Sequence, residues 1–196
     1  MDKIKLGVLV GGTSIEREVS KKSCENLLAN LDENKYEITV YHLPADGNTE
    51  WAKNIISNPP QIVLSALHGG NGENGSIQGF LHCLNIPYIG SKVLSSAICM
   101  NKAMAKTVMK ANHIQVPDHV FVMRGVDFSQ YEESIKLMGF PLIIKPNRGG
   151  SSIGVIVARN MEDIHYGIKN IIETYDDDVL IEKFIDGKEI NCCVLQ

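Results

Sequence analysis

The sequence predicts two parts of different fold class: an open parallel α/β sheet, followed by an α+β unit with an antiparallel sheet. Two observations predict the first part. Short apolar runs alternate with helical segments, and the links between them are short and rich in glycine. The second part is predicted from one observation: its strand patterns follow one another with few helices between them. We place the domains at residues 1–92 and 93–196.

The first part begins with an apolar run at residues 4–10 that ends in two glycines, which indicates a strand buried on both faces. A helix should follow and run to about residue 30. Thr13 or Ser14 is its expected N-cap, with acidic residues in the first turn. The remaining expected elements are a strand at 36–43, a helix at 51–58, a strand at 61–67, a helix at 75–85 and a brief strand at 86–90.

The second part is predicted to contain three helices among its strands. The helices are expected at 101–113, at 131–139 (ended by Gly139) and at 160–175 (capped by Asn160). Strands are expected at 119–123, 140–146 and 152–158, and a hairpin is expected from residues 178–185 and 188–195 around Asp186-Gly187. Because an apolar strand pattern continues to the last residues, we expect the sequence to be a fragment.

Bulk composition argues against several classes of protein. The 196 residues have a net charge of −4 and are 44% hydrophobic, which disfavours disorder and nucleic-acid binding through bulk charge. No apolar stretch approaches the roughly 20 residues of a membrane span. The apolar run near the N-terminus is too short for a signal peptide and lacks a cleavage site. We therefore expect a cytoplasmic protein without nucleic-acid or membrane partners.

The five cysteines are interpreted as small core residues of a reducing compartment. Their number is odd, and no two of them have the C-x-x-C spacing of a metal or redox site. Their positions are Cys24, Cys83, Cys99, Cys192 and Cys193.

The stretch LIIKPNRGGSSIGVIV (142–157) places a Gly/Ser loop, residues 147–152, between two strand patterns. Glycine lets a backbone approach a ligand closely, and exposed N–H groups and hydroxyls beside Lys145 suit a polyphosphate. A lysine at the end of an apolar strand also costs desolvation unless it meets an anion. The loop therefore predicts a phosphate-binding segment.

Two glycine-rich links in the first part carry weaker signals. LVGGTSIERE (9–18) lies at a strand–helix junction, but its local pattern favours a plain helix start with acids near the helix dipole. It has neither the dinucleotide-binding nor the Walker pattern, which disfavours a Rossmann oxidoreductase. ALHGGNGENGSIQG (66–79) places His68 and Glu73 at the carboxyl edge of the sheet, where open α/β folds bind ligands. An acid near His68 would orient its imidazole.

Local sequence pattern alone does not decide the roles of three other charged residues. Lys102 begins a basic helix, where a solvated face is the simpler interpretation. Glu182 and Glu189 bracket the expected hairpin, and they either face one cleft or are simply exposed.

Six stretches, in order along the chain, closely resemble the D-alanine–D-alanine ligase family of ATP-grasp enzymes, which act in peptidoglycan synthesis. They are GGTSIEREVS, ALHGGNGENGSIQGFL, IPYIGS, MNKAMAK, PLIIKPNRGGSSIGV and VLIEKFIDGKEI. The resemblance covers essentially the whole chain. It implies a Rossmann-like substrate domain followed by an incomplete ATP-grasp domain, in which the Gly/Ser loop covers the ATP phosphates as a lid.

The resemblance implies an ATP-dependent ligase. In the family, ATP phosphorylates the carboxylate of the first D-alanine, and the amine of the second attacks the acylphosphate. Cations and N–H donors offset the repulsion between the two anions. The implied cofactors are ATP with Mg²⁺ or Mn²⁺, the implied substrate is D-alanine, and a homodimer is implied because family members commonly pair through the first domain.

The resemblance also implies roles for residues. Glu16 and Ser151 are catalytic by this resemblance, with Glu16 pairing with the ammonium of the first D-alanine. By the same resemblance, His68 and Glu73 also belong to the binding site of that substrate. The implied ATP-binding residues are Lys102, Lys145, Ser151, Ser152, Glu182, Lys183, Phe184 and Glu189.

This sequence departs from the family pattern in two ways. Many members carry an acid where this chain has Gly149, which makes a more flexible lid an expectation. Family members are also longer, so the metal ligands, the loop over the second substrate and the oxyanion-binding arginine are expected beyond Gln196. Residues 1–196 alone should then be nearly inactive. The alternatives are a ligase that takes D-serine or D-lactate second, and a non-catalytic remnant that binds ATP.

Overall fold

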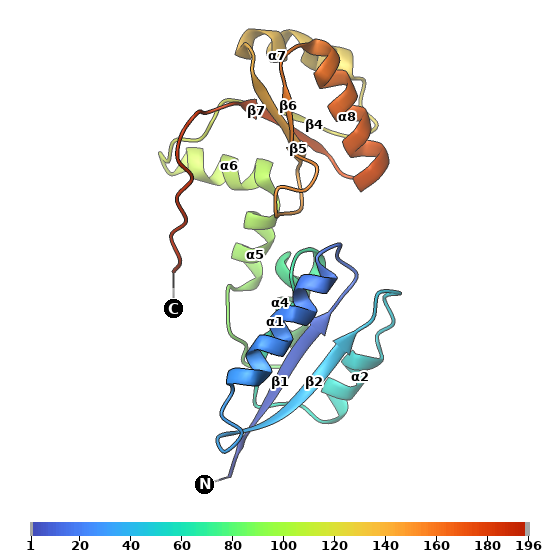
Figure 1. Ribbon diagram of the computed structural model, residues 1–196, viewed down its shortest axis with the longest axis vertical. Coiled ribbons are helices and arrows are strands. Elements are labelled where there is room, and N and C mark those ends of the chain that lie inside the picture. Colours follow the sequence, from blue (N-terminus) through green and yellow to red (C-terminus); the bar gives the residue numbers. More distant parts are fainter. Residues whose placement is uncertain (1, 195–196) are drawn as a thin grey trace. The chain divides into compact units, whose positions relative to one another are not determined.

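The computed structural model describes residues 2–194, which form two compact units (Figure 1). The first unit ends at Ala97 and the second begins at Ile98. The boundary expected from the sequence, between residues 92 and 93, falls at the start of helix α5 (Val93–Met100). This helix was not predicted.

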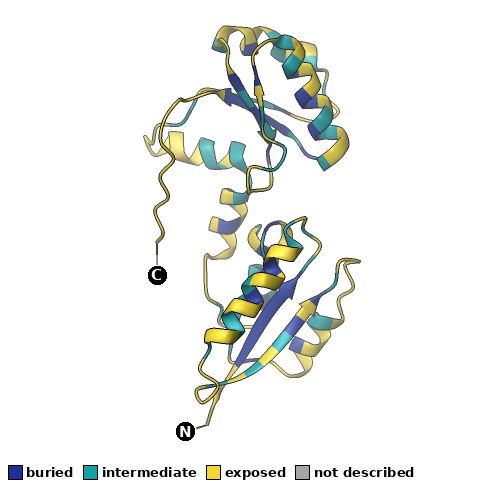
Figure 2. Cartoon of the chain, in the orientation of Figure 1, coloured by how far each residue is buried: buried dark blue, intermediate teal, exposed yellow. Residues whose placement is uncertain are grey.

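The first unit contains a three-stranded parallel sheet of order β2-β1-β3, as predicted. The central strand β1 (Ile4–Gly11) lies between β2 (Tyr36–Leu43) and β3 (Ile62–Ser65). Leu9 belongs to one core cluster and Val8 to another, so the two faces of β1 are both buried. Figure 2 shows this strand as a nearly continuous buried segment. Its unbroken apolar sequence follows from that position.

The helices of this unit cover both faces of the sheet. Helix α1 (Arg17–Asn30) covers one face, where Cys24 packs with Val8. Helices α2 (Glu50–Ser57) and α4 (Ser76–Cys83) contribute to the core on the other face. A buried hydrogen bond also attaches α1 to the sheet: the Gly11 N–H of β1 donates to the Ser20 hydroxyl of α1 at 2.8 Å.

The ends of several elements differ from the prediction. Helix α1 starts later than expected, because residues 13–16 form bends and a turn in which the Arg17 N–H donates to the Ser14 carbonyl. The one-turn helix α3 (Gly70–Glu73) was not predicted. The brief strand expected at 86–90 is a single parallel bridge between Tyr88 and Val63.

The second unit contains a four-stranded sheet of order β4-β7-β5-β6, and its pairings are antiparallel, as predicted. Its strands are β4 (His119–Val122), β5 (Leu142–Pro146), β6 (Ile156–Ala158) and β7 (Val179–Lys183). The predicted strands at 119–123, 140–146 and 152–158 are therefore present, with shorter bounds.

Helices α7 (Glu132–Met138) and α8 (Met161–Tyr175) pack on this sheet and form a core with its apolar side chains. A short 3₁₀ helix, η1 (Phe128–Tyr131), precedes α7. The predicted cap of α8 is confirmed, because the Asn160 side chain accepts a hydrogen bond from the Asp163 N–H at 2.9 Å. Helix α6 (Lys102–Ala111) completes the unit.

The predicted hairpin after β7 is wrong for the residues that the structure describes. Strand β7 lies between β4 and β5, so both of its edges are already hydrogen-bonded. A second arm that returned through Asp186-Gly187 would find no free edge on β7. Residues 188–194 are instead exposed and belong to no helix or strand, and Figure 1 shows them as an extended trace; residue 195 lies outside the described range.

The prediction that the cysteines are core residues holds only for Cys24. The other four cysteines are exposed, and all five are free thiols. Cys83 ends helix α4, Cys99 lies on α5, and the remaining two lie in the extended segment after β7. Residue type alone does not determine which face of a helix or which segment a small side chain occupies, so the prediction failed.

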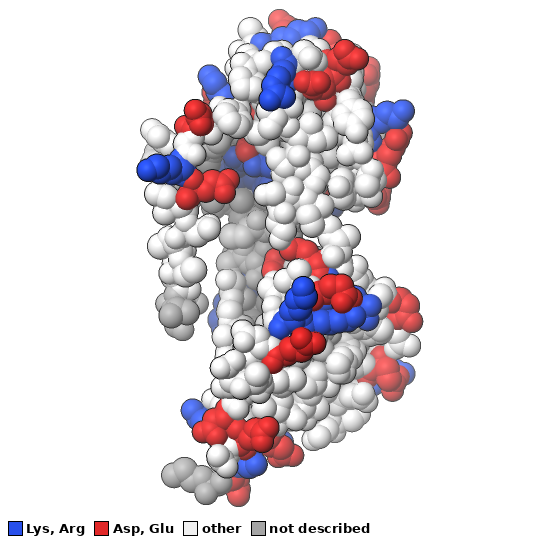
Figure 3. All heavy atoms as spheres, viewed as in Figure 1, with Lys and Arg blue, Asp and Glu red and all other residues white. Residues whose placement is uncertain are grey.

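Charged side chains of both signs are interspersed on the molecular face shown in Figure 3. Some form ion pairs within a helix. Lys21 pairs with Glu18 in α1 at 2.7 Å, and Lys53 pairs with Glu50 in α2 at 2.8 Å. These exposed pairs contribute little to stability, because water and salt screen them. Among residues 2–194, no helix combines the length and the apolarity needed to cross a membrane.

Candidate active site

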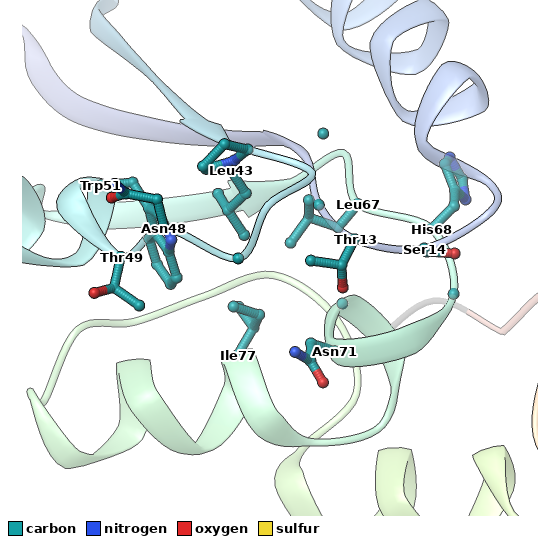
Figure 4. Close-up of a pocket in the computed structure, with 16 residues that line it drawn as sticks. Thr13, Ser14, Leu43, Asn48, Thr49, Trp51, Leu67, His68, Asn71 and Ile77 are labelled. Atoms are coloured by element: carbon teal, nitrogen blue, oxygen red, sulfur yellow. The ribbon is translucent and has the colours of Figure 1, made fainter. Parts of the chain in front are cut away.

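The carboxyl edge of the parallel sheet carries a small pocket of about 120 Å³ (Figure 4). The links after β1, β2 and β3 all contribute to it. Trp51, Leu67 and Ile77 provide apolar lining, and Thr13 and Asn71 provide polar groups. This position matches the edge at which open α/β sheets bind ligands. The volume suits a small molecule better than a drug-sized one, which needs 300–1,000 Å³.

His68 lies at this edge with a polar partner near each ring nitrogen. Its Nε2 atom is 2.8 Å from the Ser23 hydroxyl, and its Nδ1 atom is 3.7 Å from a carboxylate oxygen of Glu73. The contact predicted between His68 and Glu73 is therefore present. Ser23 was missed, because it comes from helix α1, far away in the sequence. The Ser23 hydroxyl orients the imidazole ring through a hydrogen bond, and the Glu73 carboxylate lies beyond hydrogen-bond distance of it.

Glu16 lies beside the segment that follows His68. A side-chain carbon built on Gly69 would come within 2.4 Å of a Glu16 carboxylate oxygen and 2.6 Å of the Ser14 hydroxyl. Gly69 also has a φ of +63°, which favours glycine. The absence of a side chain at this position lets the two links approach each other. The structure thus brings together Glu16, His68 and Glu73, the predicted substrate-binding residues of the first unit.

The second unit brings Lys145 and Glu182 together on one face of its sheet. In the register of β5 and β7, Glu182 pairs with Ile143 and Lys145 pairs with Leu180, so the two charged residues are diagonal neighbours. The Lys145 ammonium forms an ion pair with Glu182 Oε1. Both side chains are mostly buried, which makes this contact a structural feature of the unit.

Lys106 of helix α6 forms a second ion pair with the same carboxylate, and the sequence interpretation missed it. Its ammonium is 2.7 Å from Glu182 Oε2. Burial alone would raise the pKa of Glu182, but the charges of Lys106 and Lys145 beside the carboxylate outweigh it and hold the pKa below its ordinary value. The sequence did contain a signal for Lys106, because it follows Lys102 by four residues and therefore lies on the same face of the helix.

Lys102 is bound to the Gly/Ser loop. Its ammonium donates to the Gly149 carbonyl at 2.7 Å and lies 3.5 Å from the Asn147 carbonyl. Burial lowers the pKa of this lysine, and the charge of Lys145 lowers it further. The solvated helix face favoured by local pattern is therefore wrong for Lys102. Three lysines and one carboxylate form a cluster beside the loop: Lys102, Lys106, Lys145 and Glu182.

The start of helix α6 has no free N–H group among its first four. The N–H groups of Lys102 and Ala103 donate to the backbone and side-chain oxygens of Asn147 at 3.0 Å. Those of Met104 and Ala105 donate to the side-chain and backbone oxygens of Asn101. A helix start usually attracts anions through such groups. Here an anion would have to be met by lysine side chains and by the Gly/Ser loop.

The Gly/Ser loop has a fixed base and an exposed tip. Asn147 is fully buried, and the Arg148 N–H donates to the buried carboxylate of Asp177 at 2.5 Å. Burial raises the pKa of Asp177, although two backbone N–H groups oppose this effect. At the tip, Ser151 and Ser152 are exposed and have φ angles of +52° and +57°. Non-glycine residues with such angles are often found at ligand-binding segments.

The other residues predicted to bind ATP lie at or after the end of β7. The Lys183 N–H donates to the Asp118 carbonyl, and the Phe184 N–H donates to the Pro141 carbonyl, so the backbone is fixed there. Both side chains are exposed, with Phe184 39% exposed. Glu189 is exposed in the extended segment, outside the lysine cluster.

The acidic residues that the structure describes form no complete site for a divalent cation. Within residues 2–194, no group of three or more His, Cys, Asp or Glu side chains is arranged to hold a metal ion. Glu182, the acid nearest the predicted phosphate site, is already paired with two lysines. No step of the chemistry is therefore assigned to a metal bound by these residues.

Comparisons with known proteins agree with the sequence resemblance. Residues 49–91 match the model of the D-Ala–D-Ala ligase N-terminus, and residues 108–196 match the model of the C-terminus. The D-alanine–D-alanine ligase of Bacillus anthracis is 41% identical over 192 residues, which are 97% of this chain and 60% of that protein. The chain thus spans about 60% of the length of such curated relatives.

Solved structures give the same assignment. The Bacillus anthracis D-alanine–D-alanine ligase complexed with ATP superposes with a TM-score of 0.80 and 37% identity, over 94% of this chain and 60% of that one. The VanG D-Ala:D-Ser ligase of Enterococcus faecalis gives a TM-score of 0.80 at 27% identity, over 95% of this chain and 64% of that one. Together with the two family models, these likenesses show that the chain belongs to the D-alanine–D-alanine ligase family.

Proposed function

We propose that this chain serves the ATP-dependent joining of two D-alanine molecules into D-alanyl-D-alanine for peptidoglycan synthesis. The lysine cluster beside the Gly/Ser loop is the observation that carries the proposal. Lys102 and Lys145 offer two ammonium groups at a loop whose exposed tip contains two hydroxyls. Such a set of donors suits the triphosphate of ATP, and a solved relative with a similar fold is complexed with ATP.

The amino-acid substrate is proposed to bind at the carboxyl edge of the first sheet. Glu16 would accept the ammonium of the first D-alanine, and His68, oriented by Ser23 and with Glu73 nearby, would face its carboxylate. Ser151 is proposed to act with the neighbouring N–H groups at the γ-phosphate. The nucleoside would be held by Glu182, Lys183, Phe184 and Glu189.

Several further proposals accompany this function. Mg²⁺ or Mn²⁺ would accompany ATP, because a triphosphate needs charge neutralisation for transfer, and it is assigned no ligand among the described residues. A cytoplasmic location is proposed because ATP is available there and the cysteines are free thiols. A homodimer is proposed from the family resemblance alone, and light scattering of the purified protein would test it.

The function is tested on the full gene product, by measuring phosphate release from ATP in the presence of D-alanine. The dipeptide should form together with phosphate, and D-serine or D-lactate should be poorer second substrates. A preference for D-serine would instead support the activity of the VanG relative. ATP binding without any turnover would support a non-catalytic ATP-binding protein, and the absence of ATP binding would refute the proposal.

Two substitutions test the residue roles. K145A should weaken ATP binding and lower the turnover rate together, whereas K169A, at a mostly exposed lysine of helix α8, should change neither. E16Q should raise the KM for the first D-alanine by about 5- to 150-fold, which corresponds to the roughly 1–3 kcal/mol of a charged hydrogen bond. Unchanged kinetics of either variant would remove that residue from the site.

A further inference from the structure

We propose that Lys106 is a positioning residue of the ATP site, which controls the phosphate-binding strength of Lys145 through the buried carboxylate of Glu182. This role rests on the proposed binding of ATP phosphates by Lys145. The family resemblance gives no role to Lys106. The residue would touch neither the nucleotide nor the reacting atoms, and its effect would pass through one carboxylate.

The geometry links the two lysines through the two oxygens of one side chain. Glu182 Oε1 is paired with Lys145 of strand β5, and Glu182 Oε2 is 2.7 Å from the ammonium of Lys106 of helix α6. The side chains of Glu182, Lys106 and Lys145 are only 10%, 12% and 21% exposed. Little water therefore reaches these charges, and each of them depends on its protein partners.

The balance of charge explains why a second lysine is needed. Lys145 and Glu182 alone form a pair with no net charge, which would attract a phosphate weakly. Lys106 raises the net charge of the group to +1, because two ammoniums then share one carboxylate. It also forms an ion pair with the second oxygen of Glu182, so that the carboxylate charge is shared and Lys145 is not fully neutralised. An incoming phosphate can then act as the second anion for Lys145.

The other lysine of the cluster does not share this link. Lys102 lies on the same face of α6, but its ammonium is bound to the carbonyl of Gly149 in the Gly/Ser loop. A change at Lys106 leaves the two carbonyl partners of Lys102 in place. The effect of Lys106 on phosphate binding should therefore be carried by Glu182 and Lys145.

The experiment measures dissociation constants of ATP, inorganic tripolyphosphate and adenosine by calorimetry on the full gene product. In K106M, which keeps the apolar stem but loses the charge, binding of ATP and of tripolyphosphate should weaken about tenfold, the effect of one lost charge contribution. Adenosine binding should weaken less than tripolyphosphate binding, because K106M keeps the Glu182 carboxylate that is proposed to hold the nucleoside. K106R should recover most of the phosphate affinity. K110M, at an exposed lysine of the same helix, is the matched control.

A double substitution separates positioning from a general loss of structure. In K106M/E182Q the net charge of the group returns to +1, so the tripolyphosphate affinity lost in K106M should be regained. If K106M does not fold, K106Q, which keeps a hydrogen-bond donor for Glu182, replaces it, and an intermediate loss is expected.

Three results would overturn the role of Lys106: wild-type tripolyphosphate affinity in K106M, equal losses for adenosine and tripolyphosphate, or no recovery in the double variant. Failure of the wild-type protein to bind ATP would instead refute the proposed function, on which this role depends.

Discussion

Glu182 shows how single residues acquire properties that their neighbours in the sequence do not give them. It lies on a central strand among apolar residues, where an isolated carboxylate would be costly to bury. Two lysines from different elements compensate for that cost and keep the group ionised. The pair with Lys145 joins β5 to β7, and the pair with Lys106 joins the sheet to helix α6. The carboxylate therefore stabilises the unit as well as arranging the lysines.

The lowered pKa of Glu182 predicts a stability that depends on pH. A carboxyl group whose pKa is lower in the folded state contributes stability above its ordinary pKa of 4.5, and loses it as the pH falls through the folded value. E182Q should be less stable than the wild type by about 1–3 kcal/mol at pH 7, because two buried ammoniums lose their charged partner. The difference should shrink below pH 4.5. Urea unfolding followed by circular dichroism measures it, and a difference independent of pH would contradict the ionised pair.

Ser23 is a second residue whose position only the fold reveals. Its hydroxyl lies 2.8 Å from His68 Nε2 and orients the imidazole, whereas the Glu73 carboxylate lies 3.7 Å from Nδ1. S23A should raise the KM for the first D-alanine by about fivefold, the equivalent of roughly 1 kcal/mol for one hydrogen bond, with a smaller effect on ATP. S57A, at an exposed position of helix α2, is the control. Equal changes in the KM values of both substrates would indicate a general disturbance of the unit.

At the scale of elements, the Gly/Ser loop and helix α6 are built as one feature. Asn147 is the first residue of the loop after strand β5. Its oxygens accept hydrogen bonds from the first two N–H groups of α6. Lys102 returns from the helix to the Gly149 carbonyl. The base of the loop is thereby fixed, while its tip is exposed, an arrangement suited to a segment that closes over a ligand.

The end of this loop region gives an element-scale prediction. Gly154 has a φ of +73°, and an added side-chain carbon would lie 2.9 Å from Pro146 and from Tyr175. G154A should therefore destabilise the second unit by about 1–3 kcal/mol, through backbone strain and overpacking between β5, β6 and α8. G187A is the matched control, because open space surrounds that glycine. Chemical denaturation of both variants tests this, and equal stability would contradict the packing argument.

At the scale of the whole molecule, the two units carry different halves of the proposed chemistry. The predicted amino-acid contacts lie on the parallel sheet of the first unit, and the predicted phosphate contacts lie on the antiparallel sheet of the second. The separation follows from the folds. Parallel strands gather several links at one edge, whereas a pair of antiparallel strands can hold an exposed loop between them.

This division predicts distinct protection patterns in hydrogen exchange. A nonhydrolysable ATP analogue should slow amide exchange in the second unit, at residues 102–106, 145–154 and 179–184, because a bound ligand suppresses local opening. D-alanine should slow exchange in the first unit, at residues 11–16 and 68–73. Protection of the first-unit segments by the ATP analogue alone, with none in the lysine cluster, would contradict the assignment of the phosphate site.

The sequence by itself determined the features that depend on neighbouring residues. Apolar runs with short glycine-rich links gave the parallel sheet, Asn160 gave a helix start, and the Gly/Ser loop beside Lys145 gave a candidate phosphate-binding segment. Each of these depends on local backbone geometry or on hydrophobic periodicity, which a few consecutive residues specify. The family resemblance added roles for residues that were ambiguous locally, such as Glu16 and Lys102.

Only the tertiary structure decided which distant groups meet. It placed Lys106 and Lys145 on the same carboxylate, brought Ser23 to His68, and put β7 in the interior of its sheet, which excluded the predicted hairpin. Strand order and side-chain pairing depend on how separate elements pack. Local pattern does not encode that packing, because an ion pair or a shared edge forms between residues that have no fixed spacing along the chain.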